Sequence, residues 1–91
     1  MNHAVEAIGI FEVGGFTPAM VGLDAMEKGA EVRVIQAELN DFLGTVIKIE
    51  GTVASVRSAL AAGEQAAQRM GAKPIVSIIP RPDADAWPKG S

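Results

Sequence analysis

Hydrophobic and polar residues follow two different periods along the chain. In four short stretches, apolar and often β-branched residues alternate with polar or small ones, which predicts strands over residues 4–13, 31–39, 44–50 and 74–79. In two longer stretches the apolar residues recur every three or four positions, which predicts a helix over residues 18–28 and an alanine-rich helix over 53–70. The order of elements is therefore strand, helix, strand, repeated once.

Residues suited to helix ends stand at the expected limits of both helices. Thr17 supplies an N-cap hydroxyl before Pro18, whose missing N–H costs nothing in the first helical turn. Thr52 is placed to cap the second helix in the same way. Gly29 and Gly71 are each placed to end a helix in the left-handed conformation that glycine adopts without strain.

The short break at residues 40–43 joins the second and third strands, so these two strands are expected to pair antiparallel. Right-handed crossovers through the helices then predict a four-stranded antiparallel sheet with both helices on one face. This is an α+β fold, the ferredoxin-like βαββαβ sandwich, which hosts many unrelated functions. We expect one domain over residues 1–82 and a short proline-containing tail over 83–91.

The composition of the chain excludes several kinds of partner and of chemistry. The chain has 91 residues, a net charge of −3 and no block of lysines or arginines, so we expect no nucleic-acid partner. It has no cysteine, which excludes disulfides and a thiolate nucleophile. Neither a signal sequence nor a run of eighteen apolar residues is present, so we expect a cytoplasmic protein without a membrane partner. A core this small also favours oligomerisation.

The segment Ile78-Ile79-Pro80-Arg81-Pro82 is the most informative motif. The two prolines remove backbone donors and fix φ, so Arg81 is held on a stiff extended segment. Together with the strands AIGIFEV and TVIKIEG, the helix patch at residues 24–28 and the helix end at residues 66–71, this segment resembles the BMC-domain shell proteins of bacterial microcompartments. The resemblance covers residues 4–83, nearly the whole chain.

This resemblance implies a structural shell protein, not an enzyme, that needs no cofactor. Six copies would form a flat cyclic homohexamer, the hexamers would tile edge to edge, and a central pore would limit the passage of metabolites. The implied partners are further copies of the chain, other shell proteins and encapsulated enzymes, in a microcompartment shell within the cytoplasm.

The resemblance assigns the edge between hexamers to Lys28 and Arg81, with Asp24 and Glu31 beside them. The stem of Lys28 would lie along its counterpart while its ammonium group reaches carbonyl oxygens across the contact. Without the resemblance, Lys28 would be a helix-terminal cation that complements the helix dipole, and Arg81 a solvated loop charge.

The pore is assigned to Asn40, Asp41, Phe42 and Leu43, where many relatives have a short loop of glycine and small residues. Six copies of Phe42 could form an apolar constriction, and six copies of Asp41 a ring of negative charge that repels anions. Alternatively, Phe42 and Leu43 pack between subunits and Asp41 lies on the face of the disc.

Other classes of function have less support in the residues. The single histidine, His3, has no ligand-like partners, so we expect neither a catalytic set nor a metal site. The alternative that remains is an oligomeric ferredoxin-like regulatory module that binds a small molecule. Gly14-Gly15 before a helix start could hold an anion there, although paired glycines are common in turns. Assembly distinguishes the two, because a regulatory module would form smaller oligomers.

Overall fold

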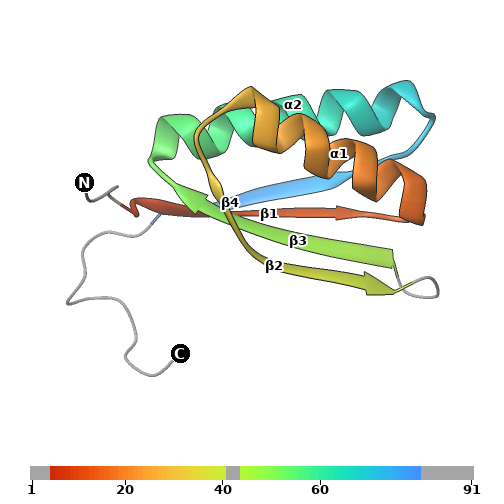
Figure 1. The fold of residues 1–91 in the computed structure, drawn as a ribbon, viewed down its shortest axis with the longest axis horizontal. Coiled ribbons are helices and arrows are strands. Elements are labelled where there is room, and N and C mark those ends of the chain that lie inside the picture. The colour runs from red at the N-terminus through yellow and green to blue at the C-terminus, as the bar shows by residue number, and fades with distance from the viewer. Residues whose placement is uncertain (1–4, 41–43, 81–91) are drawn as a thin grey trace.

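The computed structural model describes residues 5–40 and 44–80, and it contains the six expected elements. In chain order they are β1 (Ala7–Val13), α1 (Phe16–Gly29), β2 (Arg33–Asn40), β3 (Gly44–Gly51), α2 (Val53–Arg69) and β4 (Ile75–Pro80). All neighbouring strands pair antiparallel, in the order β2-β3-β1-β4. Both helices cover one face of this sheet (Figure 1). The predicted ferredoxin-like sandwich is confirmed.

The core lies between the sheet and the helices. Alternation along β1 buries Phe11 and Val13 on the helix-covered face, and alternation along β3 does the same for Ile47 and Ile49. The buried residues of the helices that meet them are Ala19, Met26, Val56, Ala59, Leu60, Ala66 and Ala67. Neither α1 nor α2 lies over the opposite side of the sheet, called the uncovered face here (Figure 1).

Two glycines allow close packing of α1, Gly22 against Phe11 of β1 and Gly63 of α2 against Met26. A Cβ added to Gly22 would lie 2.6 Å from Cζ of Phe11, and one added to Gly63 would lie 2.6 Å from Cγ of Met26. These distances are shorter than any real contact, so neither position can take alanine without moving core side chains. The buried face of α1 is thus set by Ala19, Gly22 and Met26.

The predicted ends of α2 are confirmed. The Thr52 hydroxyl accepts a hydrogen bond from the Ser55 N–H at 3.1 Å, and the Glu6 carboxylate accepts one from the Val53 N–H at 3.1 Å. At the other end Gly71 has φ +84°, and its N–H donates to the Gln68 carbonyl at 2.9 Å. This hydrogen bond is typical of a helix closed by a left-handed glycine.

The predicted ends of α1 are wrong. Thr17 is not the cap, because the helix begins at Phe16 after Gly15, whose φ is +95° and which makes no side-chain capping bond. Gly29 is the last helical residue, and the chain continues at Ala30 in the extended region instead of through a left-handed glycine. Gly29 has a packing role, since a Cβ there would lie 2.9 Å from Cβ of Ala62 on α2.

Other element limits shift by one to three residues from the prediction. Met20 and Val21, which belong to the predicted apolar repeat of α1, are 38% and 36% exposed. Within the described part of the chain, no helix is long and apolar enough to span a membrane.

Candidate assembly surfaces

Different strands and helices begin and finish at the two ends of the protomer. At the tip end, β1 and β2 finish, β3 and β4 begin, α1 starts and α2 stops (Figure 1). The strand register fixes this arrangement, because Val13 pairs with Thr45, Thr45 with Leu39, and Glu12 with Ile75. At the opposite end, called the far end here, α1 stops, α2 starts and β4 finishes.

The strand residues on either side of the predicted pore segment lie at the tip end. Asn40, the last residue of β2, pairs with Gly44, the first of β3. Asp41, Phe42 and Leu43 between them lie outside the described residues. Gly44 has φ +105°, and a Cβ there would lie 3.3 Å from the carbonyl oxygen of Val13. Glycine is therefore needed where β3 leaves this connection and passes the end of β1.

The predicted edge residues that the structure describes lie toward the far end. Lys28 Nζ is 3.1 Å from Asp24 Oδ2, one helical turn away, and the two side chains are 76% and 62% exposed. Glu31, in the connection between α1 and β2, is exposed and forms no ion pair with Lys28. Arg81 lies outside the described residues, and it follows Pro80, the last residue of β4 at the far end.

A hollow of about 190 Å³ lies at the tip end, and the sequence did not indicate it. In the strand register Glu12 stands between Val46 and Ile75 on the uncovered face. The residues around the hollow are Glu12, Val13, Gly14, Gly44, Thr45, Val46, Lys73 and Ile75. Gly14, the candidate anion-holding residue, thus shares this hollow with one carboxylate, Glu12, and one ammonium group, Lys73, so the charges around it give no net attraction for an anion.

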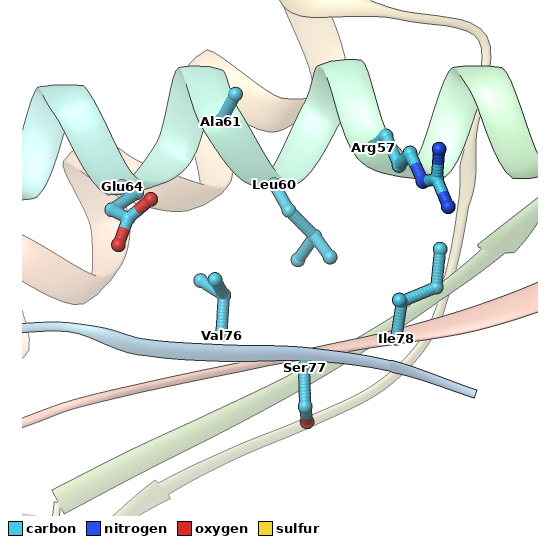
Figure 2. Close-up of a pocket in the computed structure, with 7 residues that line it drawn as sticks. All are labelled: Arg57, Leu60, Ala61, Glu64, Val76, Ser77 and Ile78. Carbon is cyan, nitrogen blue, oxygen red and sulfur yellow. The ribbon is translucent and has the colours of Figure 1, made fainter.

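A second, mainly apolar groove of about 240 Å³ lies between α2 and β4. Figure 2 shows Leu60, Val76 and Ile78 reaching into the space between the helix and the strand. Arg57 and Glu64 lie toward its two ends, seven residues apart on α2 (Figure 2). Helical periodicity alone could have marked Arg57, Leu60 and Glu64 as one flank of α2, but the strand that completes the groove is distant in sequence.

Among residues 5–40 and 44–80, no group of three or more His, Asp or Glu side chains is arranged to hold a metal ion. The ion pairs found there are two exposed or partly exposed ones, Lys28 with Asp24 and Arg33 with Glu50. Surface pairs of this kind contribute roughly 0–1 kcal/mol to stability, so both leave their side chains free to exchange partners.

Comparisons with known proteins agree on one family. The family model for the BMC domain matches residues 7–82. The chain is 40% identical over 89 residues to the bacterial microcompartment shell protein PduA of Salmonella typhimurium, covering 93% of this chain and 94% of that protein. It is 46% identical over 83 residues to the carboxysome assembly protein CcmO of Synechococcus elongatus, covering 89% of this chain and 29% of CcmO.

A solved structure supports the same assignment. The crystal structure of a microcompartment protein from Desulfitobacterium hafniense superposes with a TM-score of 0.75 at 31% identity, over 87% of this chain and 44% of that one. The predicted resemblance is confirmed, and the alternative of a small regulatory module is not favoured. The chain belongs to the BMC-domain family of bacterial microcompartment shell proteins.

Proposed function

We propose that six copies of this chain form a flat ring, with the tip ends at the six-fold axis and the far ends at the rim. The observation that carries this proposal is the separation of the predicted functional segments. Asn40 and Gly44, which flank the predicted pore residues in the sequence, are at the tip end, whereas Lys28 and the end of β4 are toward the far end (Figure 1). A protomer with pore residues at one end and edge residues at the other suits a closed cyclic assembly.

At the rim, Lys28 and Arg81 make the contacts between neighbouring rings. The ion pair with Asp24 keeps the Lys28 ammonium group on the outer surface of α1, and this pair is weak enough to open when a neighbour supplies carbonyl acceptors. Glu31 adds a carboxylate to the same edge. Because each contact between two rings is related by two-fold symmetry, every interaction in it occurs twice.

At the axis, six copies of the segment from Asn40 to Leu43 surround a pore that limits the passage of metabolites. Phe42 supplies an apolar constriction and Asp41 a ring of carboxylates, so cations and neutral molecules pass in preference to anions. The substitution Phe42→Ser tests this. It should increase the permeation of a small polar substrate into assembled shells, measured by the turnover of an enclosed reporter enzyme. Unchanged turnover would contradict the constriction.

In this function the domain at residues 1–82 is the tile, and residues 83–91 are the short tail that follows it in the sequence. Its partners are identical rings, other shell proteins and the enzymes enclosed by the shell, all in the cytoplasm. The chain itself performs no catalysis and holds no cofactor. The support for this non-catalytic role is membership of a family whose named relatives are shell and assembly proteins.

Negative-stain electron microscopy of the purified chain at high concentration tests the tile directly. The expected result is flat sheets with six-fold symmetry and a density minimum at each axis. Dispersed dimers or trimers, stabilised against heat by a metabolite, would overturn the proposal and favour a regulatory module.

A further inference from the structure

The outward side of edge strand β4 is apolar. Figure 2 shows Ser77 pointing away from α2, whereas Val76 and Ile78 on either side of it point toward the helix. Because side chains alternate along a strand, Ile75 and Ile79 point with Ser77 to the uncovered face. These two isoleucines are 66% and 44% exposed. Strand β4 therefore presents two large apolar side chains to the uncovered face, about 13 Å apart at a rise of roughly 3.3 Å per residue.

Strand β1 extends this apolar surface. In the strand register, Ile8 lies beside Ile79 and Ile10 lies beside Ser77. Both β1 residues are half-buried and alternate with buried residues that face the helices, so their side chains are on the uncovered face. Neither helix lies over this face (Figure 1). The four side chains that form this apolar patch are Ile8, Ile10, Ile75 and Ile79.

The apolar patch lies at an edge of the sheet that has little protection against association. The sequence of β4, IVSIIP, contains no charged residue before its final proline. The other edge strand, β2, contains Arg33 and Glu38 and has an irregularity in its pairing near Ile35. Charges and irregular pairing keep edge strands from associating, whereas an exposed apolar patch marks a contact surface. The apolar patch is therefore the part of the uncovered face that needs a cover.

Charged residues on the rest of the uncovered face differ between its two halves. Among the described residues, the strand register places two cations and one carboxylate in the far-end half: Arg33, Lys48 and Glu50. Glu50 pairs with Arg33 at 3.5 Å, and neither ion pair of the described residues includes Lys48. The tip-end half, with its hollow, holds two carboxylates and one cation: Glu12, Glu38 and Lys73. The far-end half is thus positive by one charge and the tip-end half negative by one.

The tail over residues 83–91 carries its charges in the order that matches this difference. Its sequence is DADAWPKGS, so two aspartates precede Trp87 and one lysine follows it. Trp87 is the only tryptophan of the chain, and an indole side chain buries roughly 150–250 Å² when an apolar surface covers it. A tail that returned from the far end over the uncovered face would bring its acidic residues over the positive half, the indole over the apolar patch and Lys89 toward the negative half.

The chain is long enough for this path. Trp87 is seven residues beyond Pro80, the last residue of β4, which ends at the far end. Seven residues of extended chain span at most about 23 Å, which exceeds the length of the apolar patch from Ile79 to Ile75. Asp83 is of a residue type that favours turns, and a reversal there brings Trp87 back to about the level of Ile79.

We propose that residues 83–91 fold back over the uncovered face of their own chain, with Trp87 on the apolar patch between Ile8 and Ile79. The two aspartates then lie on the side of the cations of the far-end half, and Lys89 lies toward Glu12. Because the tail is joined to β4, the contact is intramolecular, and the effective concentration of the tail is on the order of millimolar. The contact needs neither the ring nor a second protein.

Fluorescence tests the contact directly, since Trp87 is the one tryptophan and the chain has no tyrosine. In the unmodified protein its emission maximum should lie at a shorter wavelength than in the urea-unfolded chain, and acrylamide should quench it at least about twofold less. Ile79→Glu should remove both differences, because it places a carboxylate in the apolar patch. Met70→Glu is the matched control and should change neither, since Met70 is 46% exposed but lies at the end of α2, in the helical layer.

Thermal unfolding confirms that both variants fold. Emission and quenching of the unmodified protein equal to those of the unfolded chain would overturn the proposal. An emission maximum that Ile79→Glu leaves unchanged would overturn it too, because the indole would then be buried elsewhere. So would the loss of the wavelength shift on dilution, since a contact within one chain does not depend on protein concentration.

Disulfide trapping shows which chain the tail covers. The chain has no cysteine of its own, and Ser77 lies two residues from Ile79 toward the tip end. Lys89 is two residues beyond Trp87, so Ser77→Cys/Lys89→Cys should form an intramolecular disulfide under mild oxidation. Ser58→Cys/Lys89→Cys is the matched control and should stay reduced, because Ser58 is exposed on α2. On a non-reducing gel after alkylation, covalent dimers or free thiols from the first variant would overturn the proposal.

Docking of Trp87 also restrains Arg81, whose backbone then lies between β4 and the anchored tail. This consequence rests on the proposed function, in which Arg81 contacts a neighbouring ring. Trp87→Ala should raise the protein concentration at which sheets form at least about threefold, because a restrained segment loses less entropy on binding, while native mass spectrometry shows the same hexamers. Hexamers of Trp87→Ala that form sheets as readily as the unmodified protein would overturn this consequence. If the unmodified protein forms no hexamer, the proposed function fails, whereas the fluorescence and the disulfide still decide whether the tail docks.

Discussion

The turns and helix ends at the tip end of the protomer depend on glycine, whereas those at the far end depend on polar side chains. Within residues 5–40 and 44–80, positive φ angles occur at Gly15, Gly44 and Gly71, and all three positions are at the tip end. At the far end, side chains stabilise the chain instead. Thr52 and Glu6 accept hydrogen bonds from the first N–H groups of α2, and Asp24 pairs with Lys28 nearby.

This difference matches the two roles proposed for the ends. Turns made by glycine are narrow, so six tip ends can approach one axis closely and leave the space at the axis to the residues of the pore segment. Charged side chains on a broad end can form and exchange contacts with neighbouring rings. Changes at the tip end should therefore affect the fold and the ring, whereas changes at the far end should affect tiling first.

The largest expected effect is on tiling. Lys28→Ala should abolish flat sheets and leave the hexamer intact, because the contact between rings loses both of its symmetry-related lysines at once. Electron microscopy and native mass spectrometry of the same sample separate these two levels. Arg81→Ala should behave in the same way. Normal sheets from either variant would contradict the assignment of the rim to the far end.

The next largest effect is on folding at the tip end. Gly44→Ala should lower the free energy of unfolding by about 1–3 kcal/mol, since the residue needs a positive φ and its Cβ would crowd the Val13 carbonyl oxygen. Gly71→Ala is the matched control. It shares the positive φ but has nothing within 4 Å of the added Cβ, so the expected loss is smaller, about 1–2 kcal/mol. Urea unfolding at equal protein concentration measures both, and equal losses would show that crowding at Gly44 contributes nothing.

At the far end the comparable change is milder. Thr52→Ala removes the hydrogen bond to the Ser55 N–H and should cost about 1 kcal/mol of stability, whereas Thr52→Ser should retain most of it. Chemical unfolding of the two variants tests this difference. A loss equal to that of Gly44→Ala would remove the distinction between the two ends.

The smallest effect is expected at Asp24. Asp24→Ala removes the exposed ion pair with Lys28, one helical turn away, which should change the free energy of unfolding by less than about 0.5 kcal/mol. Sheets should still form, because Lys28 keeps its own contacts across the rim. If Asp24→Ala abolished sheets as Lys28→Ala is expected to, Asp24 would have to touch the neighbouring ring directly.

The sequence predicts the elements and their topology because each depends on local patterns. Alternation along β1 and β3 is visible in the letters, and Thr52 and Gly71 mark α2 by their own chemistry. The ends of α1 were predicted wrongly, because Thr17 and Gly29 have the right chemistry for caps while the helix is placed by packing. Gly29 meets Ala62, a residue 33 positions away in the chain.

Some of the candidate surfaces could be predicted from the sequence and others could not. The edge at Lys28 and the pore at Asp41 and Phe42 came from resemblance to a family, since an exposed lysine or a short loop carries little signal alone. The groove between α2 and β4 could not be predicted, because it exists only where Leu60 meets Val76 and Ile78 across the fold. Likewise, the repeat containing Met20 and Met26 allowed more than one buried face, and the small residues Ala19 and Gly22 decided which one packs.

The central claim is that six copies of the chain assemble into one closed ring, and native mass spectrometry at low protein concentration tests it most directly. The account predicts a dominant species of about 56 kDa, six times the 9.4 kDa of the chain. A dominant monomer, dimer or trimer under the same conditions would contradict it, and the opposite ends of the protomer would then need another explanation.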